Sequence, residues 1–324
     1  MAANTTSTYG KTQTGSIEPT GLIGGNTVND DTGSPINKLG VDALPPPGVM
    51  PGLVMEGTGG NDRLIGSNLA DEMHGFGGHD QLFGAGGDDR MFGDAGNDIL
   101  DGGSGNDFLV GGLGADRFIG GIGTDTVSYA AATAGIELNL NLGYGFGGEA
   151  SGDTFQSIER IVGSNYRDIL AAGQTAAVLD GGAGNDLLAG GGGTVSQADT
   201  LQGGNGNDTL IAGDRTTWMA GGSGADTFLF GFTPALVADF EAGVDKIDAW
   251  PVNMWDGPFG HDGVLATGTA VPSEAAADRD GFFYDTDDYR LYHLQYFDDG
   301  GMEAKLQATF LNGVQLQASD FITI

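Results

Sequence analysis

Apolar and polar positions repeat along residues 57–128 with a period of nine residues. The consecutive copies are GTGGNDRLI, GSNLADEMH, GFGGHDQLF, GAGGDDRMF, GDAGNDILD, GGSGNDFLV, GGLGADRFI and GGIGTDTVS. Position one is always glycine, position six is always aspartate and position eight is always a large apolar residue. A flexible glycine-rich linker would keep no such register, so the pattern indicates a folded repeat array.

Each nonapeptide predicts a turn of six residues followed by a strand of three. In such a strand, positions seven and nine face one way and position eight faces the other, so position eight forms the interior. One copy buries almost nothing, whereas stacked copies bury a continuous apolar column. The turn needs backbone conformations that glycine adopts readily. Its carbonyls and the aspartate carboxylate are then the oxygen ligands that a hard cation prefers.

This array resembles the RTX (repeats-in-toxin) calcium-binding repeats of proteins that Gram-negative bacteria secrete, and the resemblance covers about residues 57–324. It implies an all-β fold in which two nonapeptides form one coil of a right-handed parallel β-roll. It also implies Ca²⁺ between turns two repeats apart on each side of the roll. The implied calcium ligands of this first block are Asp62, Asp71, Asp80, Asp89, Asp98, Asp107, Asp116 and Asp125.

A second block of repeats begins at Gly163, and its copies are GSNYRDILA, AGQTAAVLD, GGAGNDLLA, a thirteen-residue copy at 190–202, GGNGNDTLI, AGDRTTWMA and GGSGADTFL. Position eight stays apolar, but Ala177 and Thr217 replace the aspartate of position six. Because consecutive turns alternate sides, both replacements and the insertion fall on one side. We therefore expect the second roll to hold calcium mainly on the other side. The implied ligands of this block are Asp168, Asp186, Asp199, Asp208 and Asp226.

The remaining segments complete the expected domain organisation. Residues 1–52 are expected to be disordered or extended, and the two calcium rolls span 53–128 and 163–230. Between them, 129–162 is expected to be a strand pair that caps the first roll and starts the second, with a strand over Ile136–Leu142 and a loop over Gly143–Gly152. Residues 231–324 are expected to form an antiparallel β cap, as the alternation of Lys305–Phe310 suggests. They resemble the end of RTX regions, which implies a type I secretion signal.

Composition and charge restrict the partners. The chain has 324 residues and a formal net charge of −32, so nucleic acid, which needs a basic surface, is not an expected partner. Without cysteine, extracellular stabilisation must come from metal. No apolar run predicts a membrane span. MAANTTSTYGKTQTGS lacks the apolar core of a signal peptide, so we expect export through the type I secretion machinery that the resemblance implies.

The chain contains no H-E-x-x-H zinc motif and no G-x-S-x-G nucleophile elbow, and we expect it not to be an enzyme. The sequence thus predicts a secreted calcium-binding protein that folds on binding calcium and has a structural, surface or adhesive role. Two alternatives stay open. One is a module that binds or acts on cell-surface polysaccharide, with Trp250 or Trp255 stacking on sugars. The other is a cation-dependent signalling or pore-associated protein.

Overall fold

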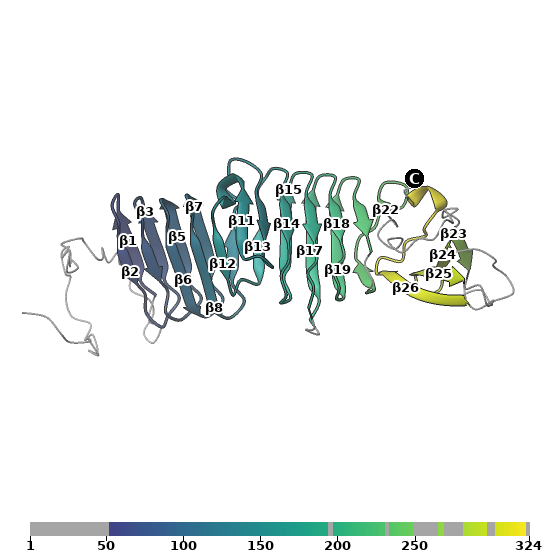
Figure 1. Ribbon diagram of the computed structural model, residues 1–324, viewed down its shortest axis with the longest axis horizontal. Helices are drawn as coiled ribbons and strands as arrows, with labels where there is room; N and C mark the ends of the chain where they lie inside the picture. Colours follow the sequence, from purple (N-terminus) through teal and green to yellow (C-terminus); the bar gives the residue numbers. More distant parts are fainter. Residues whose placement is uncertain are drawn as a thin grey trace, which may run out of the picture.

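The computed structural model describes residues 52–193, 197–230, 233–248, 265–268, 281–296 and 302–321. Most of them form one long roll, in which the chain passes repeatedly between two β-sheets (Figure 1). Within these ranges, the structure has no helix with the length and apolar character that crossing a membrane requires.

The first sheet collects the strands that follow every second turn and has 14 strands. In sheet order they are β1 (Val54–Thr58), β3 (Glu72–Phe76), β5 (Arg90–Ala95), β7 (Phe108–Leu113), β9 (Thr126–Ser128), β13 (Arg160–Val162), β15 (Val178–Ala183), β17 (Asp199–Asn205), β19 (Thr217–Ser223), β21 (Ala235–Val237), β26 (Met302–Phe310), β25 (Arg290–Tyr296), β24 (Gly281–Asp285) and β23 (Leu265–Gly268).

The second sheet collects the strands that follow the other turns and has 12 strands. In sheet order they are β2 (Arg63–Ile65), β4 (Gln81–Phe83), β6 (Ile99–Ser104), β8 (Arg117–Ile122), β12 (Thr154–Gln156), β11 (Tyr144–Gly147), β10 (Glu137–Asn139), β14 (Ile169–Ala171), β16 (Leu187–Ala189), β18 (Thr209–Ile211), β20 (Thr227–Leu229) and β22 (Lys246–Asp248). Two 3₁₀ turns, η1 (Gly148–Ala150) and η3 (Ala318–Asp320), are also present.

Position eight of the repeats forms the core, as the alternation predicts. Within the second sheet, Leu82 of β4 pairs in parallel register with Leu100 of β6, which pairs with Phe118 of β8. All three side chains are fully buried. Each apolar residue therefore stacks on its equivalent 18 residues away, and the column runs through both blocks. The expected all-β parallel roll is confirmed.

The segment between the repeat blocks continues the roll instead of closing it. Strand β13 pairs in parallel with both β9 and β15, so the first sheet passes from one block to the next without interruption. In the second sheet, β12 stacks on β8 and β10 stacks on β14, and β11 joins them through antiparallel pairing. The loop expected over Gly143–Gly152 therefore contains a strand, because β11 fills the space between two parallel neighbours.

The C-terminal strands close the other end of the roll. Strand β26 pairs in parallel with β21. Strand β25 pairs antiparallel with both β24 and β26, as expected of an antiparallel cap, whereas β23 pairs in parallel with β24. The ring of Phe240 lies 5.7 Å from that of Phe228 and 5.3 Å from that of Phe310. Since these three side chains are almost fully buried, tail aromatics here complete the core at the end of the apolar column.

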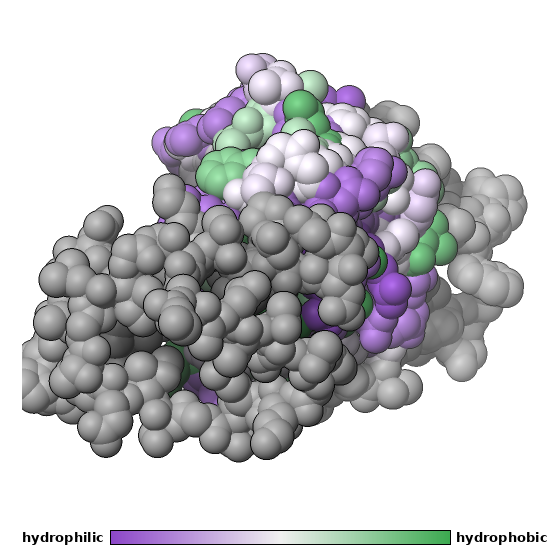
Figure 2. Space-filling view, turned by 90° about the vertical axis from the view of Figure 1, so that its left-hand side faces the viewer, coloured by the Kyte–Doolittle hydropathy of each residue, from purple (hydrophilic) through white to green (hydrophobic). Residues whose placement is uncertain are grey.

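Positions seven and nine form the outer faces. On the first sheet, the guanidinium of Arg90 lies 5.7 Å from the ring centroid of Phe92 and 4.7 Å from that of Phe108. The ring of His74 stacks on Phe92 with centroids 4.6 Å apart. Figure 2 views the molecule from the β1 end, and its coloured surface mixes hydrophilic and hydrophobic residues. On the outer face of the first block, aromatic rings and cationic side chains therefore lie in contact with one another.

Candidate metal centre

The aspartates of position six form two hydrogen-bonded ladders along the edges of the roll. The backbone N–H of Asp62 donates to Oδ1 of Asp80 (2.7 Å), and that of Asp80 donates to Oδ1 of Asp98 (2.8 Å). The same bond joins Asp71 to Asp89 on the opposite edge (2.8 Å). Each bond spans 18 residues, so it links turns that stack directly on one another. The structure thus brings together carboxylates two repeats apart, as the resemblance to RTX repeats implies.

The turns fall into two kinds, which differ at position two. In a capped turn, the N–H of position two donates to the carboxylate of the same turn, as in Ser67 to Asp71 and Ser164 to Asp168 (both 2.6 Å). Thr58 and Asp62 form the same bond. In an open turn, position two has a left-handed backbone, for example φ of 75° at Ala85, and Oδ2 of the aspartate has no partner. The turn conformation therefore decides whether the carboxylate is satisfied.

Nine of the described turns are open, and each contains a buried carboxylate oxygen without a hydrogen-bond partner. These oxygens are Oδ2 of Asp80, Asp89, Asp98, Asp107, Asp116, Asp125, Asp186, Asp208 and Asp226. Oδ1 of Asp62 is also buried without a partner. A buried charged oxygen that lacks a partner is costly, so such a series indicates a missing positive ligand.

Oxygens from two stacked turns converge beside the glycine of position one. A Cβ built on Gly93 would lie 2.5 Å from Oδ2 of Asp98 and 2.8 Å from the carbonyl oxygen of Gly111, two repeats further on. Any larger residue at this position would occupy the space between these oxygens. Glycine at position one therefore keeps open a small cradle lined by one carboxylate and one carbonyl oxygen.

This donor set suits calcium. Ca²⁺ takes six to eight oxygen ligands from carboxylates, backbone carbonyls and water, and it tolerates irregular geometry. Within the described part of the chain, no three acidic, histidine or cysteine side chains gather into one cluster. Sites that combine one aspartate with turn carbonyls would form no such cluster, and they would also disfavour zinc, which prefers nitrogen and sulfur ligands.

Burial of these carboxylates changes their protonation. Desolvation raises the pKa of Asp89, Asp116 and Asp186 to about 7 each. It raises the pKa of Asp80 and Asp98 to about 6, and the neighbouring aspartates of the ladder add to both shifts. The hydrogen bond that each Oδ1 accepts acts in the opposite direction and is too weak to compensate. Without a cation, the ladder therefore favours protonated carboxyls.

Three further acidic residues extend the ladders beyond the repeats that the sequence pattern identified. The N–H of Asp116 donates to Asp153 Oδ1 (2.7 Å), that of Asp125 to Glu159 Oε2 (3.0 Å) and that of Asp226 to Asp245 Oδ1 (3.0 Å). Each residue stands two positions before an apolar residue that continues the core, as in Asp245-Lys246-Ile247. An acidic residue two positions before a core apolar residue is the sequence signal by which these three residues could have been found.

Asp199 departs from the expectation that it binds calcium. Its Oδ1 accepts the N–H of Ala177 (3.0 Å), and its Oδ2 accepts the N–H of Gly191 (2.8 Å) and Nε of Arg215 (3.0 Å). Both oxygens are therefore occupied, in contrast to those of the open turns. The physical reason is a buried guanidinium that supplies the positive charge locally. At the neighbouring turn, the hydroxyl of Thr217 takes the place of a carboxylate and accepts the N–H of Gly213.

The comparison with protein families agrees with this geometry. The family of the RTX calcium-binding nonapeptide repeat matches in four copies, at residues 56–91, 92–127, 162–194 and 195–228. No curated protein matches the chain. The chain thus contains RTX calcium-binding repeats, and the repeats of this family bind Ca²⁺. Trp250 and Trp255, the candidates for sugar stacking, lie outside the described residues, as does almost all of the N-terminal segment 1–52.

The left-handed turns generate a prediction on stability. Ala85 has φ of 75°, a conformation that costs an L-residue about 1–2 kcal/mol and glycine much less. We expect Ala85→Gly to raise the free energy of unfolding by about 1 kcal/mol in saturating calcium. Urea denaturation measures this change. Ala115→Gly, in an exposed turn position with negative φ, is the control and should lower stability slightly. Equal effects of both variants would contradict the strain at Ala85.

The raised pKa values generate a prediction on pH. The pKa of Asp89 is about 7 in the calcium-free fold and 3.8 without burial, so the folded state binds more protons than the unfolded chain between these values. The calcium-free fold should lose stability as pH rises from about 4 to 7. In excess chelator, we therefore expect β structure by circular dichroism at pH 5 and its loss at pH 8. Added calcium should abolish this dependence, and greater stability at pH 8 than at pH 5 in chelator would contradict it.

Proposed function

We propose that the protein is an extracellular calcium-binding protein whose roll folds when calcium enters the gaps between stacked turns. The observation that carries the proposal is the series of nine buried carboxylate oxygens without partners. Each needs a positive charge, and no described side chain forms a hydrogen bond with any of these oxygens. Calcium bound between the turns would satisfy these oxygens together with the carbonyls that converge beside position one.

The arrangement of open turns agrees with the number of gaps. In the first block, four stacked turns on each edge leave three gaps, and six of its turns are open. In the second block, the edge with Asp168, Asp186, Asp208 and Asp226 leaves three gaps, and three of its turns are open. We therefore assign up to six ions to the first block and three to the second, all on one edge of it. The capped turns of Asp62, Asp71 and Asp168 begin the three stacks.

Calcium would act as the switch for folding. Without it, adjacent buried carboxylates repel one another and remain desolvated, which opposes the gain from the apolar column. Extracellular calcium modules bind with dissociation constants of about 10⁻⁴–10⁻³ M, so the roll would stay unfolded where free calcium is scarce. Because the sites exist only in the folded chain, binding supplies folding free energy.

A non-enzymatic, structural or surface role fits this architecture best. The described carboxylates that repeat along the roll are turned inward to the gaps, where they would hold ions and not substrate. The roll is long (Figure 1), and its outer faces carry aromatic and cationic side chains in contact with one another. Such faces can support adhesion to other surface components, and identification of the partner requires capture from the surface of the producing cell with and without chelator.

Folding and ion counting test the calcium proposal. We expect a disordered far-UV circular dichroism spectrum in chelator at pH 8 and a β spectrum after millimolar calcium is added. Isothermal titration calorimetry should count about nine ions by the assignment above. An unchanged β spectrum in chelator, or a folded chain that binds no calcium, would overturn the proposal.

A single substitution tests whether Asp98 holds one of these calcium ions. Asp98→Asn keeps an oxygen that can accept the N–H of Asp80 but removes the charge, so we expect one ion fewer and a higher calcium midpoint of folding. Asp101→Asn is the matched control, since Asp101 lies in the same repeat at position nine on the outer face. The control should bind as many ions as the original chain. Loss of an ion in both variants, or in neither, would contradict the assignment of Asp98.

Secretion has its own test. The family resemblance implies a C-terminal signal read by type I secretion machinery, and we expect a chain without residues 275–324 to remain in the producing cell. Asp320→Asn is the control, because Asp320 is buried and accepts the N–H groups of Gly243 and Gln317 (both 2.8 Å). This variant loosens the docking of the C-terminal segment without shortening it and should still be exported. Export of the shortened chain would contradict a C-terminal signal.

A further inference from the structure

One edge of the second block lacks the open turns found elsewhere. The turns before β15, β17 and β19 carry Ala177, Asp199 and Thr217 at position six, and none of the three has a buried oxygen without a partner. Asp199 is completely buried, so its charge still needs compensation. Arg215, only 5% exposed, provides that charge from the following turn.

The guanidinium of Arg215 is surrounded by oxygens from two other turns. Nε donates to Oδ2 of Asp199 (3.0 Å). Nη1 donates to the carbonyl of Gln174 (2.9 Å), and Nη2 donates to the carbonyls of Gly173 (2.8 Å) and Thr175 (2.9 Å). One carboxylate and three turn carbonyls are the type of ligand set that a calcium site between stacked turns offers. Arg215 therefore joins three stacked turns through a single buried cation.

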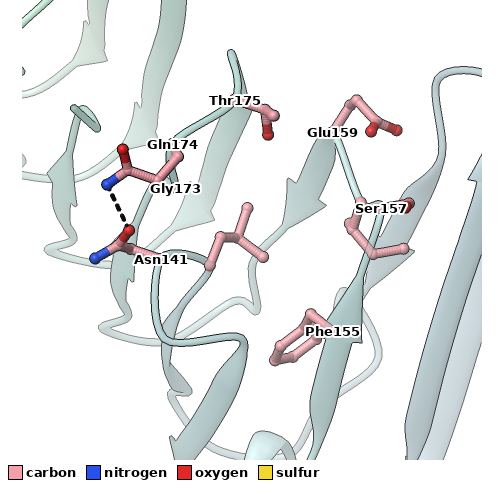
Figure 3. A pocket seen from close by; sticks show the side chains of 9 residues that line it. Asn141, Phe155, Ser157, Glu159, Gly173, Gln174 and Thr175 are labelled. Carbon is pink, nitrogen blue, oxygen red and sulfur yellow. Dashed lines mark hydrogen bonds between the residues drawn. The ribbon is translucent and has the colours of Figure 1, made fainter. Parts of the chain in front are cut away.

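The surroundings explain why this edge needs an internal cation. The turn Ser157–Glu159 has only three residues between β12 and β13, so it is shorter than the repeat turns. A pocket of about 280 Å³ separates it from Gly173, Gln174 and Thr175 (Figure 3). The stack of turns is thus interrupted at this point, and the turn 173–175 has no complete turn beneath it. Arg215 holds the turn from the other side.

We propose that Arg215 is a built-in cation that takes the place of a calcium ion on this edge, which makes the edge independent of calcium. The inference rests on the proposed calcium function, because it assigns to the guanidinium the role that calcium has in the open turns. Calcium stabilises only when it is present above its dissociation constant, whereas a covalently attached guanidinium is always present and always charged. One edge of the second block therefore requires metal and the other carries its own substitute.

Removal of the guanidinium should create a metal site. In Arg215→Ala, the buried carboxylate and three carbonyls lose their cation, and we expect the variant to bind one calcium ion more than the original chain. At a calcium concentration just sufficient to fold the original chain, the Tm of the variant should be lower by about 10 °C, since an uncompensated buried charge is strongly destabilising, and high calcium should restore most of the loss. Arg215→Lys should bind no extra ion, because the ammonium still occupies the site. Arg117→Ala, on the exposed outer face, is the control and should change neither quantity.

The original chain provides a test that does not depend on whether the variants fold. A crystal structure at high calcium should show no ion between the turn 173–175 and Asp199. An ion there, or an Arg215→Ala variant that gains no ion and whose Tm calcium does not restore, would overturn this inference. If the original chain binds no calcium at all, the proposed function itself fails. If the original chain binds calcium but Arg215→Ala binds no additional ion, only the role of Arg215 is refuted.

Discussion

Burial of negative charge between stacked turns is the constraint on which the structure depends. The same 18-residue spacing that stacks Leu82 on Leu100 in the core also stacks Asp80 on Asp98 at the edge. The apolar column cannot form without bringing these carboxylates together. Hydrogen bonds from the backbone satisfy one oxygen of each, and desolvation of the other raises the pKa of Asp80 and Asp98 to about 6. Stability of the roll is therefore coupled to a supply of positive charge.

The chain meets this constraint in three ways. The first turns of the stacks use local N–H groups, as Ser67 does for Asp71. The open turns leave an oxygen that a divalent cation can satisfy, at the cost of left-handed backbone, which even Phe76 and Asp94 adopt (φ 69° each). The third way is the guanidinium of Arg215. The three ways differ in what they require from the surroundings, since only the open turns need metal from solution.

Continuity of the roll follows from the same physics. A gap between the two repeat blocks would expose the ends of two apolar columns and two pairs of sheet edges. Strands β12 and β13 avoid this by placing Phe155 on Phe118 and Ile161 on Val127. Asp153 and Glu159 extend the ladders over the same junction. The segment between the blocks therefore reproduces both the core and the edge of a repeat, although its sequence does not follow the nonapeptide.

The sequence by itself determined the repeat and the inward position of the apolar residues, because both depend only on a period of nine and on strand alternation. The pairing of aspartates two repeats apart followed from the resemblance to RTX repeats. The sequence also located the edge of the second block on which Ala177 and Thr217 replace the aspartate of position six. Only the tertiary structure showed that turns with Ser or Thr at position two cap their own aspartate and that Arg215 reaches Asp199 and the carbonyl of Gly173, 42 residues away. Sequence spacing could not reveal these contacts, since a turn's backbone conformation and a long side chain's direction are set by the turns stacked against it.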